Sequence, residues 1–139
     1  MSEGKKRVLI VEDDQALLGL YEKKFTNSRY LVNRAEDGQE GLDKAQSESP
    51  DIILLDIMLP VMNGFEVLKN LRKKNILDKI PVVILSNYGE TKNVTEGLVS
   101  GAVEYLIKVE HTPEEVVNIV EDALREKASL VGKAFKESV

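Results

Sequence analysis

The sequence predicts an α/β domain built around a parallel β-sheet. Short runs of apolar residues alternate along the chain with stretches in which apolar residues recur at helical spacing, which is typical of repeated strand–helix units. The runs have the length and composition of strands that are buried on both faces of a parallel sheet. The expected strands lie at residues 8–11, 31–35, 52–55, 82–85 and 102–107.

The bulk composition indicates one soluble domain. The chain has 139 residues, 42% of them hydrophobic, which is enough for a single domain with a sizeable core. A net charge of -5 argues against direct binding to nucleic acid or to an anionic membrane. The lack of cysteine excludes disulfides and thiol chemistry, and no apolar stretch approaches the ~18 residues that cross a membrane. Residues 1–7 contain no signal-peptide core, so we expect a cytoplasmic protein without membrane contacts.

Capping residues mark the beginnings of four helices. An N-cap side chain accepts a hydrogen bond from the first helical turn, and a glutamate three residues later can complete a capping box. The N-caps are Asp14, Asp37, Asn63 and Thr112, and glutamates follow the last three at residues 40, 66 and 115. The residues expected on the inner faces of these helices are Leu17, Leu18, Tyr21, Phe25, Leu42, Ala45, Phe65, Leu68, Leu71, Val116, Val117, Val120, Ala123 and Leu124.

A fifth helix is expected near residues 91–100, between the last two strands. Gly101 is well placed as its C-terminal cap. Its apolar face is thin and consists of Val94, Leu98 and Val99, so we expect this helix to be among the more mobile.

The apolar stripe of the last helix continues beyond the expected domain boundary, through Ala128, Val131 and Phe135. We predict a domain at residues 1–125, followed by residues 126–139 as an extension of the last helix or a flexible tail. A longer helix would form a homodimer or lead to a second module. Gly132 weakens that interpretation, because glycine costs a helix about 1 kcal/mol relative to alanine.

Polar residues follow the predicted strands at the point where each strand ends. They are Glu12, Asp13 and Asp14 after the first strand, Asp56 after the third, Ser86 after the fourth and Lys108 after the fifth. In an open parallel sheet, ligands bind outside the carboxyl ends of the strands. Carboxylates, a hydroxyl and an amine at one edge suit a divalent cation and a phosphoryl group, and packing alone does not explain them.

These residues make the chain similar to the receiver domain of two-component response regulators, over about residues 6–125. The motifs that carry the resemblance are residues 12–14, Asp56 with the turn at 58–64, Ser86, Tyr105 with Lys108, and the junction at 35–40. Each motif alone is weak, but five in order at strand ends are highly specific. The resemblance implies a flavodoxin-like, doubly wound sheet of five parallel strands in the order 2-1-3-4-5, with five flanking helices.

The resemblance also implies a phosphoacceptor and a metal site. Asp56 would be the nucleophile that forms an acyl phosphate. Mg²⁺, or Mn²⁺, would be bound by Glu12, Asp13, Asp56 and the backbone carbonyl of Met58, with Glu12 acting directly or through water. Asp14 is assigned mostly to helix capping.

The remaining site residues would contact the phosphoryl group and report its arrival. Lys108 would pair with Asp56 at rest and with phosphoryl oxygen after transfer. Ser86 would donate its hydroxyl to a phosphoryl oxygen and pull its loop inward. Tyr105 would then rotate between an exposed and a buried position, so Ser86 and Tyr105 together would form the switch.

The implied function is that of a signalling switch. The phosphoryl group would come from a sensor histidine kinase or a histidine phosphotransfer protein, and its arrival would change protein–protein contacts. Such a domain catalyses only its own phosphorylation and dephosphorylation, so it is not an enzyme acting on other substrates. The expected output surface consists of the fourth helix, the fifth strand and the fifth helix, and the sequence does not identify the output protein.

The chain departs from the family pattern near the site. Val109 replaces the usual proline after the lysine, so we expect a trans peptide bond there, because a cis bond before a non-proline residue costs about 2.5–4 kcal/mol. Asn87 replaces a small residue and would narrow access or hold a water. Met58 and Tyr88 flank the expected path of attacking water. We expect no phosphodonor or metal role for His111, the single histidine.

Two alternative functions remain open at the level of sequence. The first is a receiver-like interaction module that is never phosphorylated; the missing proline favours it slightly, and the acidic residues oppose it. The second is a metal-dependent phosphatase of the haloacid-dehalogenase type. Those enzymes carry a second aspartate two residues after the nucleophile, where this chain has Met58.

Overall fold

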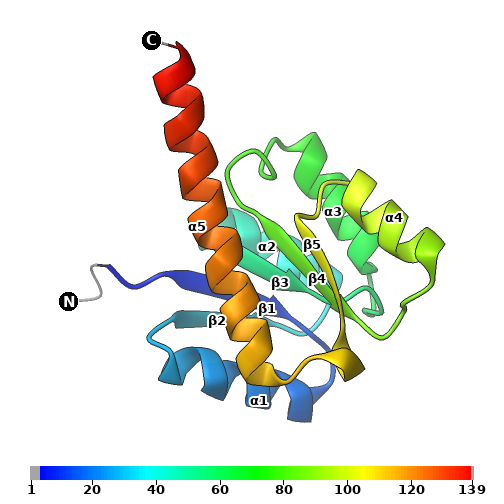
Figure 1. Cartoon of the computed structure of the whole chain (residues 1–139). Coiled ribbons are helices and arrows are strands. Elements are labelled where there is room, and N and C mark those ends of the chain that lie inside the picture. The colour runs from blue at the N-terminus through cyan, green and yellow to red at the C-terminus, as the bar shows by residue number, and fades with distance from the viewer. Residues whose placement is uncertain (1–3, 139) are drawn as a thin grey trace.

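The computed structural model describes residues 4–138 of the chain, and the side chains of residues 4–127. Its centre is a sheet of five parallel strands in the order β2-β1-β3-β4-β5, as Figure 1 shows. The strands are β1 (Arg7–Val11), β2 (Leu31–Ala35), β3 (Ile52–Leu55), β4 (Val82–Ser86) and β5 (Glu104–Ile107). The strand order and the parallel pairing confirm the predicted fold class.

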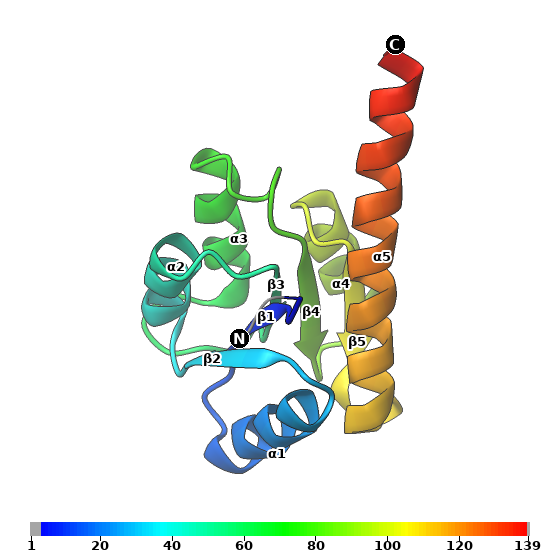
Figure 2. The same ribbon diagram turned by 90° about the vertical axis from the view of Figure 1, so that its left-hand side faces the viewer.

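Within the described residues, five helices cover the sheet on both faces, and one short 3-10 helix follows the last strand (Figures 1 and 2). They are α1 (Gln15–Asn27), α2 (Gly38–Ser47), α3 (Gly64–Lys73), α4 (Thr91–Val99), η1 (Lys108–Glu110) and α5 (Pro113–Ser138). Alternate residues of β1 serve the two faces: Val8 and Ile10 pack with α1 and α5, whereas Leu9 and Val11 pack with α2 and α3. Because both faces are covered, this strand needs an uninterrupted apolar run.

All four predicted N-caps are confirmed. The side chains of Asp14, Asp37, Asn63 and Thr112 accept hydrogen bonds from the backbone N–H groups of residues 17, 40, 66 and 115 at 3.1, 2.7, 3.0 and 3.1 Å. At α5 the reciprocal bond completes the capping box, since Glu115 accepts from the backbone N–H of Thr112 at 2.9 Å. Each helix therefore begins where the sequence places it, just beyond a strand end or loop.

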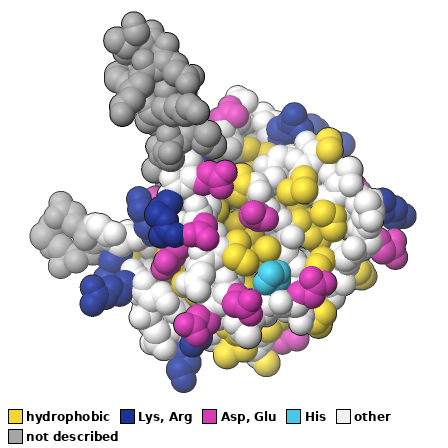
Figure 3. Space-filling model, in the orientation of Figure 1, with side chains coloured by type: hydrophobic (Ala, Val, Ile, Leu, Met, Phe, Trp, Pro, Cys, Tyr) yellow, Lys and Arg dark blue, Asp and Glu magenta, His cyan; other side chains and the backbone are white. Residues whose placement is uncertain are grey.

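The thin apolar face expected on α4 is largely exposed, with only Val94 half-buried. Leu98 and Val99 are 45% and 71% exposed, and the buried residue of this helix is Gly97. A Cβ atom on Gly97 would lie 2.7 Å from the Ile84 side chain and 2.9 Å from the Tyr105 ring, so the helix packs through the residue with no side chain. Apolar side chains are consequently left on the surface, and Figure 3 shows hydrophobic side chains gathered beside α5, over β4, β5 and α4.

The helix α5 is a continuous helix of 26 residues that extends past the end of the sheet (Figures 1 and 2). Val116, Val117, Val120 and Ala123 are buried against the sheet, as predicted. The side chains of Ala128, Val131 and Phe135 lie outside the described side chains, so the predicted domain boundary and the role of the extension stay predictions. No helix of the described residues is long and apolar enough to cross a lipid bilayer.

Candidate functional site

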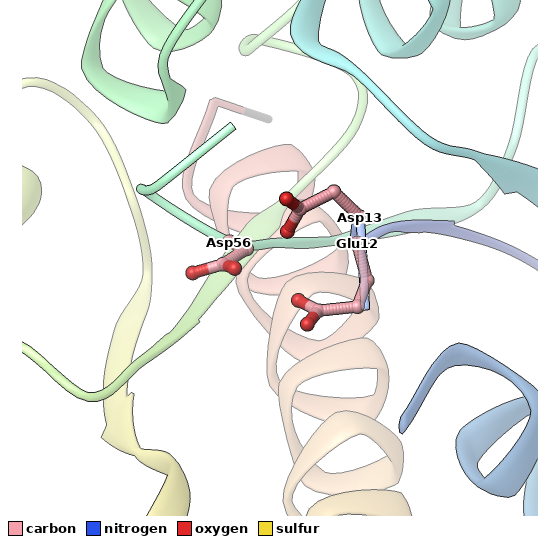
Figure 4. Close-up of side chains that lie close together, drawn as sticks. All are labelled: Glu12, Asp13 and Asp56. Atoms are coloured by element: carbon pink, nitrogen blue, oxygen red, sulfur yellow. The ribbon is translucent and has the colours of Figure 1, made fainter. Parts of the chain in front are cut away.

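Three carboxylates converge at the carboxyl edge of the sheet, as Figure 4 shows. Glu12 and Asp13 follow β1, and Asp56 follows β3, its parallel neighbour, in which Leu55 is paired with Val11. One oxygen from each carboxylate lies within 4.8 Å of the other two. Glu12 and Asp56 are only 3% and 6% exposed, whereas Asp13 is exposed. The parallel register therefore brings together residues that lie more than forty positions apart in the sequence.

An ammonium group lies between the two buried carboxylates. Lys108, which begins η1 directly after β5, places its Nζ atom 3.0 and 2.9 Å from the two oxygens of Glu12 and 3.0 Å from Asp56 Oδ2. The second oxygen, Asp56 Oδ1, accepts a hydrogen bond from the backbone N–H of Ile57 at 2.7 Å. The contact with Asp56 was predicted. The two contacts with Glu12 were not, and the only hint in the sequence is that glutamate is one methylene longer than aspartate.

Burial and proximity shift the pKa values of this cluster. Burial, together with the neighbouring Asp56, raises the pKa of Glu12 to about 7, although Lys108 acts in the opposite direction. Burial lowers the pKa of Lys108, but its bonds to Glu12 and its interactions with Asp56 outweigh this and raise the pKa above 10.5. The resting cluster therefore holds a charged ammonium together with a carboxyl group that titrates near neutral pH.

Without divalent metal, we expect Glu12 to make the free energy of unfolding fall as the pH rises. Its pKa is near 4.5 when the chain is unfolded and about 7 when it is folded, so the folded state holds this proton more tightly. The resulting stabilisation is complete below about pH 4.5 and is lost as the pH rises through about 7. Urea unfolding in EDTA at about pH 5 and about pH 8 should show a smaller decrease in Glu12→Gln than in the wild type. Equal pH dependence in the two proteins would contradict this assignment.

The backbone of Tyr88 is hydrogen-bonded to both predicted switch residues. Ser86 is buried at the end of β4, and its hydroxyl accepts a hydrogen bond from the backbone N–H of Tyr88 at 3.1 Å. The half-buried Tyr105 donates its hydroxyl hydrogen to the backbone carbonyl of Tyr88 at 2.5 Å. Burial also raises the pKa of Tyr105. The β4–α4 loop is thus held at one residue by both side chains, a link that the sequence did not indicate.

The residues that depart from the family pattern lie around this edge. The described chain contains no cis peptide bond, so the predicted trans bond before Val109 is confirmed, and Val109 is 83% exposed in η1. Met58 and Tyr88 line one open groove of about 410 Å³, together with Asn93 and other residues of α3, α4 and the loops before them. Asn87 is exposed. The roles assigned to these side chains stay predictions.

The donor set of the carboxylate cluster fits a hard divalent cation. Mg²⁺ and Mn²⁺ prefer oxygen ligands, and Glu12, Asp13 and Asp56 offer one oxygen each within a span suited to a single ion. His111, the one imidazole of the chain, is not part of this cluster. The arrangement also places the Asp56 carboxylate beside the Lys108 ammonium, which would stabilise negative charge next to that carboxylate.

Comparisons of the sequence with known proteins lead to the same family. A family model described as the response regulator receiver domain matches residues 8–121. The chain is 38% identical over 120 residues to the alkaline phosphatase synthesis transcriptional regulatory protein PhoP of Bacillus subtilis, covering 86% of this chain and 49% of that protein. It is 39% identical over 102 residues to the response regulator ArlR of Staphylococcus aureus, covering 73% and 45%. The chain therefore spans about half the length of these relatives.

Solved structures show the same fold. A CheY-like response regulator receiver domain protein from Methanospirillum hungatei superposes with a TM-score of 0.83 at 29% identity, covering 91% of this chain and 98% of that chain. The receiver domain of the Francisella response regulator 1452 superposes with a TM-score of 0.81 at 34% identity, covering 88% and 98%. With its sheet order, its strand-end residues and these matches, the chain belongs to the response regulator receiver domain family of two-component systems.

Proposed function

We propose that this domain accepts a phosphoryl group on Asp56 in a reaction that depends on Mg²⁺. The donor is a sensor histidine kinase or a histidine phosphotransfer protein. The observation that carries the proposal is the meeting of Asp56, two further carboxylates and the Lys108 ammonium at one edge of the sheet. Packing gives no reason to collect these charges, and phosphoryl transfer requires all of them.

The proposed transfer begins at the Asp56 carboxylate, one oxygen of which attacks phosphorus. Both oxygens are hydrogen-bonded at rest, Oδ1 to the Ile57 N–H group and Oδ2 to Lys108 Nζ. The bond from an Asp56 oxygen to phosphorus forms as the phosphorus–nitrogen bond of the donor phosphohistidine breaks. The leaving imidazole keeps the electron pair of that bond and takes a proton from water. Lys108 Nζ, 3.0 Å from Oδ2 at rest, is placed to neutralise charge on the phosphoryl oxygens.

The metal ligands in this proposal are the carboxylates of Glu12, Asp13 and Asp56 and the backbone carbonyl of Met58. When bound, Mg²⁺ (or Mn²⁺) neutralises and orients the phosphoryl oxygens. Asp13 is exposed and already free to bind, whereas both oxygens of Glu12 are hydrogen-bonded to Lys108. We therefore assign Asp13 as a direct ligand and Glu12 as a direct or water-bridged one.

The switch in this proposal acts through the backbone N–H and carbonyl groups of Tyr88. A phosphoryl oxygen on Asp56 attracts the Ser86 hydroxyl, which at rest accepts from the Tyr88 N–H. Moving this loop inward would break the bond from the Tyr105 hydroxyl to the Tyr88 carbonyl, and Tyr105 would rotate. The surface around α4 and β5, where Leu98, Val99 and Val103 are exposed, would then change its partner contacts.

The output is also part of the proposal. The PhoP relative is named a transcriptional regulatory protein, and the chain matches about half of it, so the response passes to a further module or to a separate protein. The domain acts as a switch that catalyses only its own phosphorylation and dephosphorylation. Homodimer formation through the extension of α5 is a second output route, and the continuous helix to Ser138 supports it.

Intact-mass measurement after incubation with acetyl phosphate tests this function. We expect one added phosphoryl group in the wild type with Mg²⁺, and none in EDTA or in Asp56→Asn. Asp43→Asn, which changes an exposed carboxylate on α2, is the matched control and should be labelled like the wild type. A folded wild type without adduct, even after rapid quenching and with no beryllofluoride binding, would favour the unphosphorylated interaction module. Continuous hydrolysis of an added phosphomonoester would instead revive the phosphatase interpretation.

A further inference from the structure

The first residue of α2 lies directly against the loop that carries the phosphoacceptor. A Cβ atom on Gly38 would be 1.7 Å from the backbone oxygen of Met62 and 2.6 Å from its carbonyl carbon. The N–H group of Gly38 donates a hydrogen bond to the carbonyl of Pro60 at 3.4 Å. The start of α2 therefore rests backbone to backbone on the loop between β3 and α3, at a distance that only glycine permits.

This loop has little freedom to move away from α2. The N–H group of Gly64 donates to the Ile57 carbonyl at 2.8 Å, and a Cβ atom on Gly64 would lie 2.3 Å from the carbonyl oxygen of Asp56. The side chain of Leu59 is buried in the core. Val61 has φ = 70°, which is rare for a β-branched residue and shows that the surroundings hold the loop in this shape.

From these contacts we propose that Gly38 is a positioning residue for the metal and phosphoryl site. Because Gly38 has no side chain, α2 can lie against the β3–α3 loop, which follows Asp56, whose carboxylate lies close to Asp13. An added methyl group would have to push the Met62 carbonyl away by roughly 1 Å, since real Cβ atoms essentially never approach within 3.0 Å of another heavy atom. The metal part of this inference rests on the function proposed above.

Gly41, one turn later on α2, provides the matched control. A Cβ atom there would lie 2.9 Å and 3.0 Å from the two methyl carbons of the buried Val11, so this variant is also crowded, but against a core side chain and not against the loop. Gly41→Ala therefore adds the same methyl group to the same helix without touching the loop. Both variants are made in a Gly19→Ala background, because a Cβ atom at Gly19 meets nothing within 4 Å and alanine strengthens α1.

Two measurements on the full chain separate positioning from general damage. The first is the Mg²⁺ dissociation constant, obtained from urea unfolding at increasing Mg²⁺. We expect it to increase about tenfold or more in Gly38→Ala and to stay within about twofold in Gly41→Ala. The second is the amide NMR spectrum without metal. The Ile57 amide signal reports the hydrogen bond of this N–H group to Asp56. We expect this signal to shift in Gly38→Ala and to remain unchanged in Gly41→Ala.

The outcomes also distinguish this inference from the proposed function. If the Gly19→Ala background itself shows no response to Mg²⁺, the metal-dependent function fails, and the Ile57 shift still tests whether Gly38 positions the loop. If the background responds but Gly38→Ala binds Mg²⁺ as tightly and leaves the Ile57 signal in place, the inference about Gly38 is overturned.

Discussion

Lys108→Ala is expected to lower the free energy of unfolding by about 3 kcal/mol at about pH 8 without metal. The substitution removes the one cation that contacts Glu12 and Asp56 in the described side chains and leaves two carboxylates that are 3% and 6% exposed. Unpaired buried charges of this kind usually cost 3–5 kcal/mol, and the position of the pair at the sheet edge places this one at the lower end. The loss should shrink at about pH 5, where Glu12 is protonated in the folded state.

Urea unfolding in EDTA measures this effect, with Lys127→Ala as the control. Lys127 makes a single hydrogen bond to the carbonyl of Asp78 at the other end of the sheet, so its replacement should cost less than about 1 kcal/mol. Adding Mg²⁺ should restore part of the stability of Lys108→Ala, because a divalent cation can take over the neutralisation of the two carboxylates. If both lysine variants lose a similarly small amount of unfolding free energy, the buried ion pairs of Lys108 do not stabilise the resting site.

Magnesium is expected to raise the melting temperature of the wild type by about 10 °C when its concentration is about a hundred times the dissociation constant. Binding at that excess stabilises the folded state by about 2.7 kcal/mol, and each kcal/mol moves the melting temperature of a domain of this size by about 4 °C. In the folded state Glu12, Asp13 and Asp56 lie close together and repel one another, and a bound cation relieves this repulsion. Because unfolding separates the three carboxylates, the cation stabilises the folded state.

Asp13→Asn should abolish most of this response and raise the stability of the metal-free protein slightly. The increase is expected to be under about 1 kcal/mol, because Asp13 is exposed and its repulsion is screened by solvent. Thermal unfolding followed by circular dichroism at increasing Mg²⁺ measures both effects. Asp14→Asn, one residue further along, keeps a helix cap and should respond to Mg²⁺ like the wild type. A wild type whose melting temperature ignores Mg²⁺ would contradict the metal site.

Local patterns in the sequence were sufficient to predict the strands, the helix starts and most of the residues that meet at the site. The apolar runs specified strands such as β1, because a strand covered on both faces must be apolar throughout. Caps such as Asp37 and Thr112 specified helix starts, since the interaction of a cap with its own first turn is local in the chain. Residues at strand ends, such as Asp56 and Lys108, could be assigned to one edge because parallel strands all end on the same side.

Contacts between distant segments could not be predicted in the same way. The exposure of Leu98 and Val99 on α4 was not predicted. Ile84 and Tyr105 occupy the space that a side chain at Gly97 would need, so the helix packs through this glycine, and no local pattern indicates that. The bonds from Lys108 to Glu12 depend on how far two side chains reach across the sheet edge. The hydrogen bonds of Ser86 and Tyr105 to the Tyr88 backbone likewise depend on the path of the β4–α4 loop.

By itself, then, the sequence determined the fold class, the family and the starts of the four capped helices, because periodicity, capping and strand-end chemistry are local properties of the chain. Only the tertiary structure decided that Lys108 bonds to both oxygens of Glu12, that α4 packs through a glycine, and that Gly38 lies against the backbone of Met62. Those features depend on distances of a few ångströms between segments far apart in the chain, and packing sets such distances only when the whole domain is assembled.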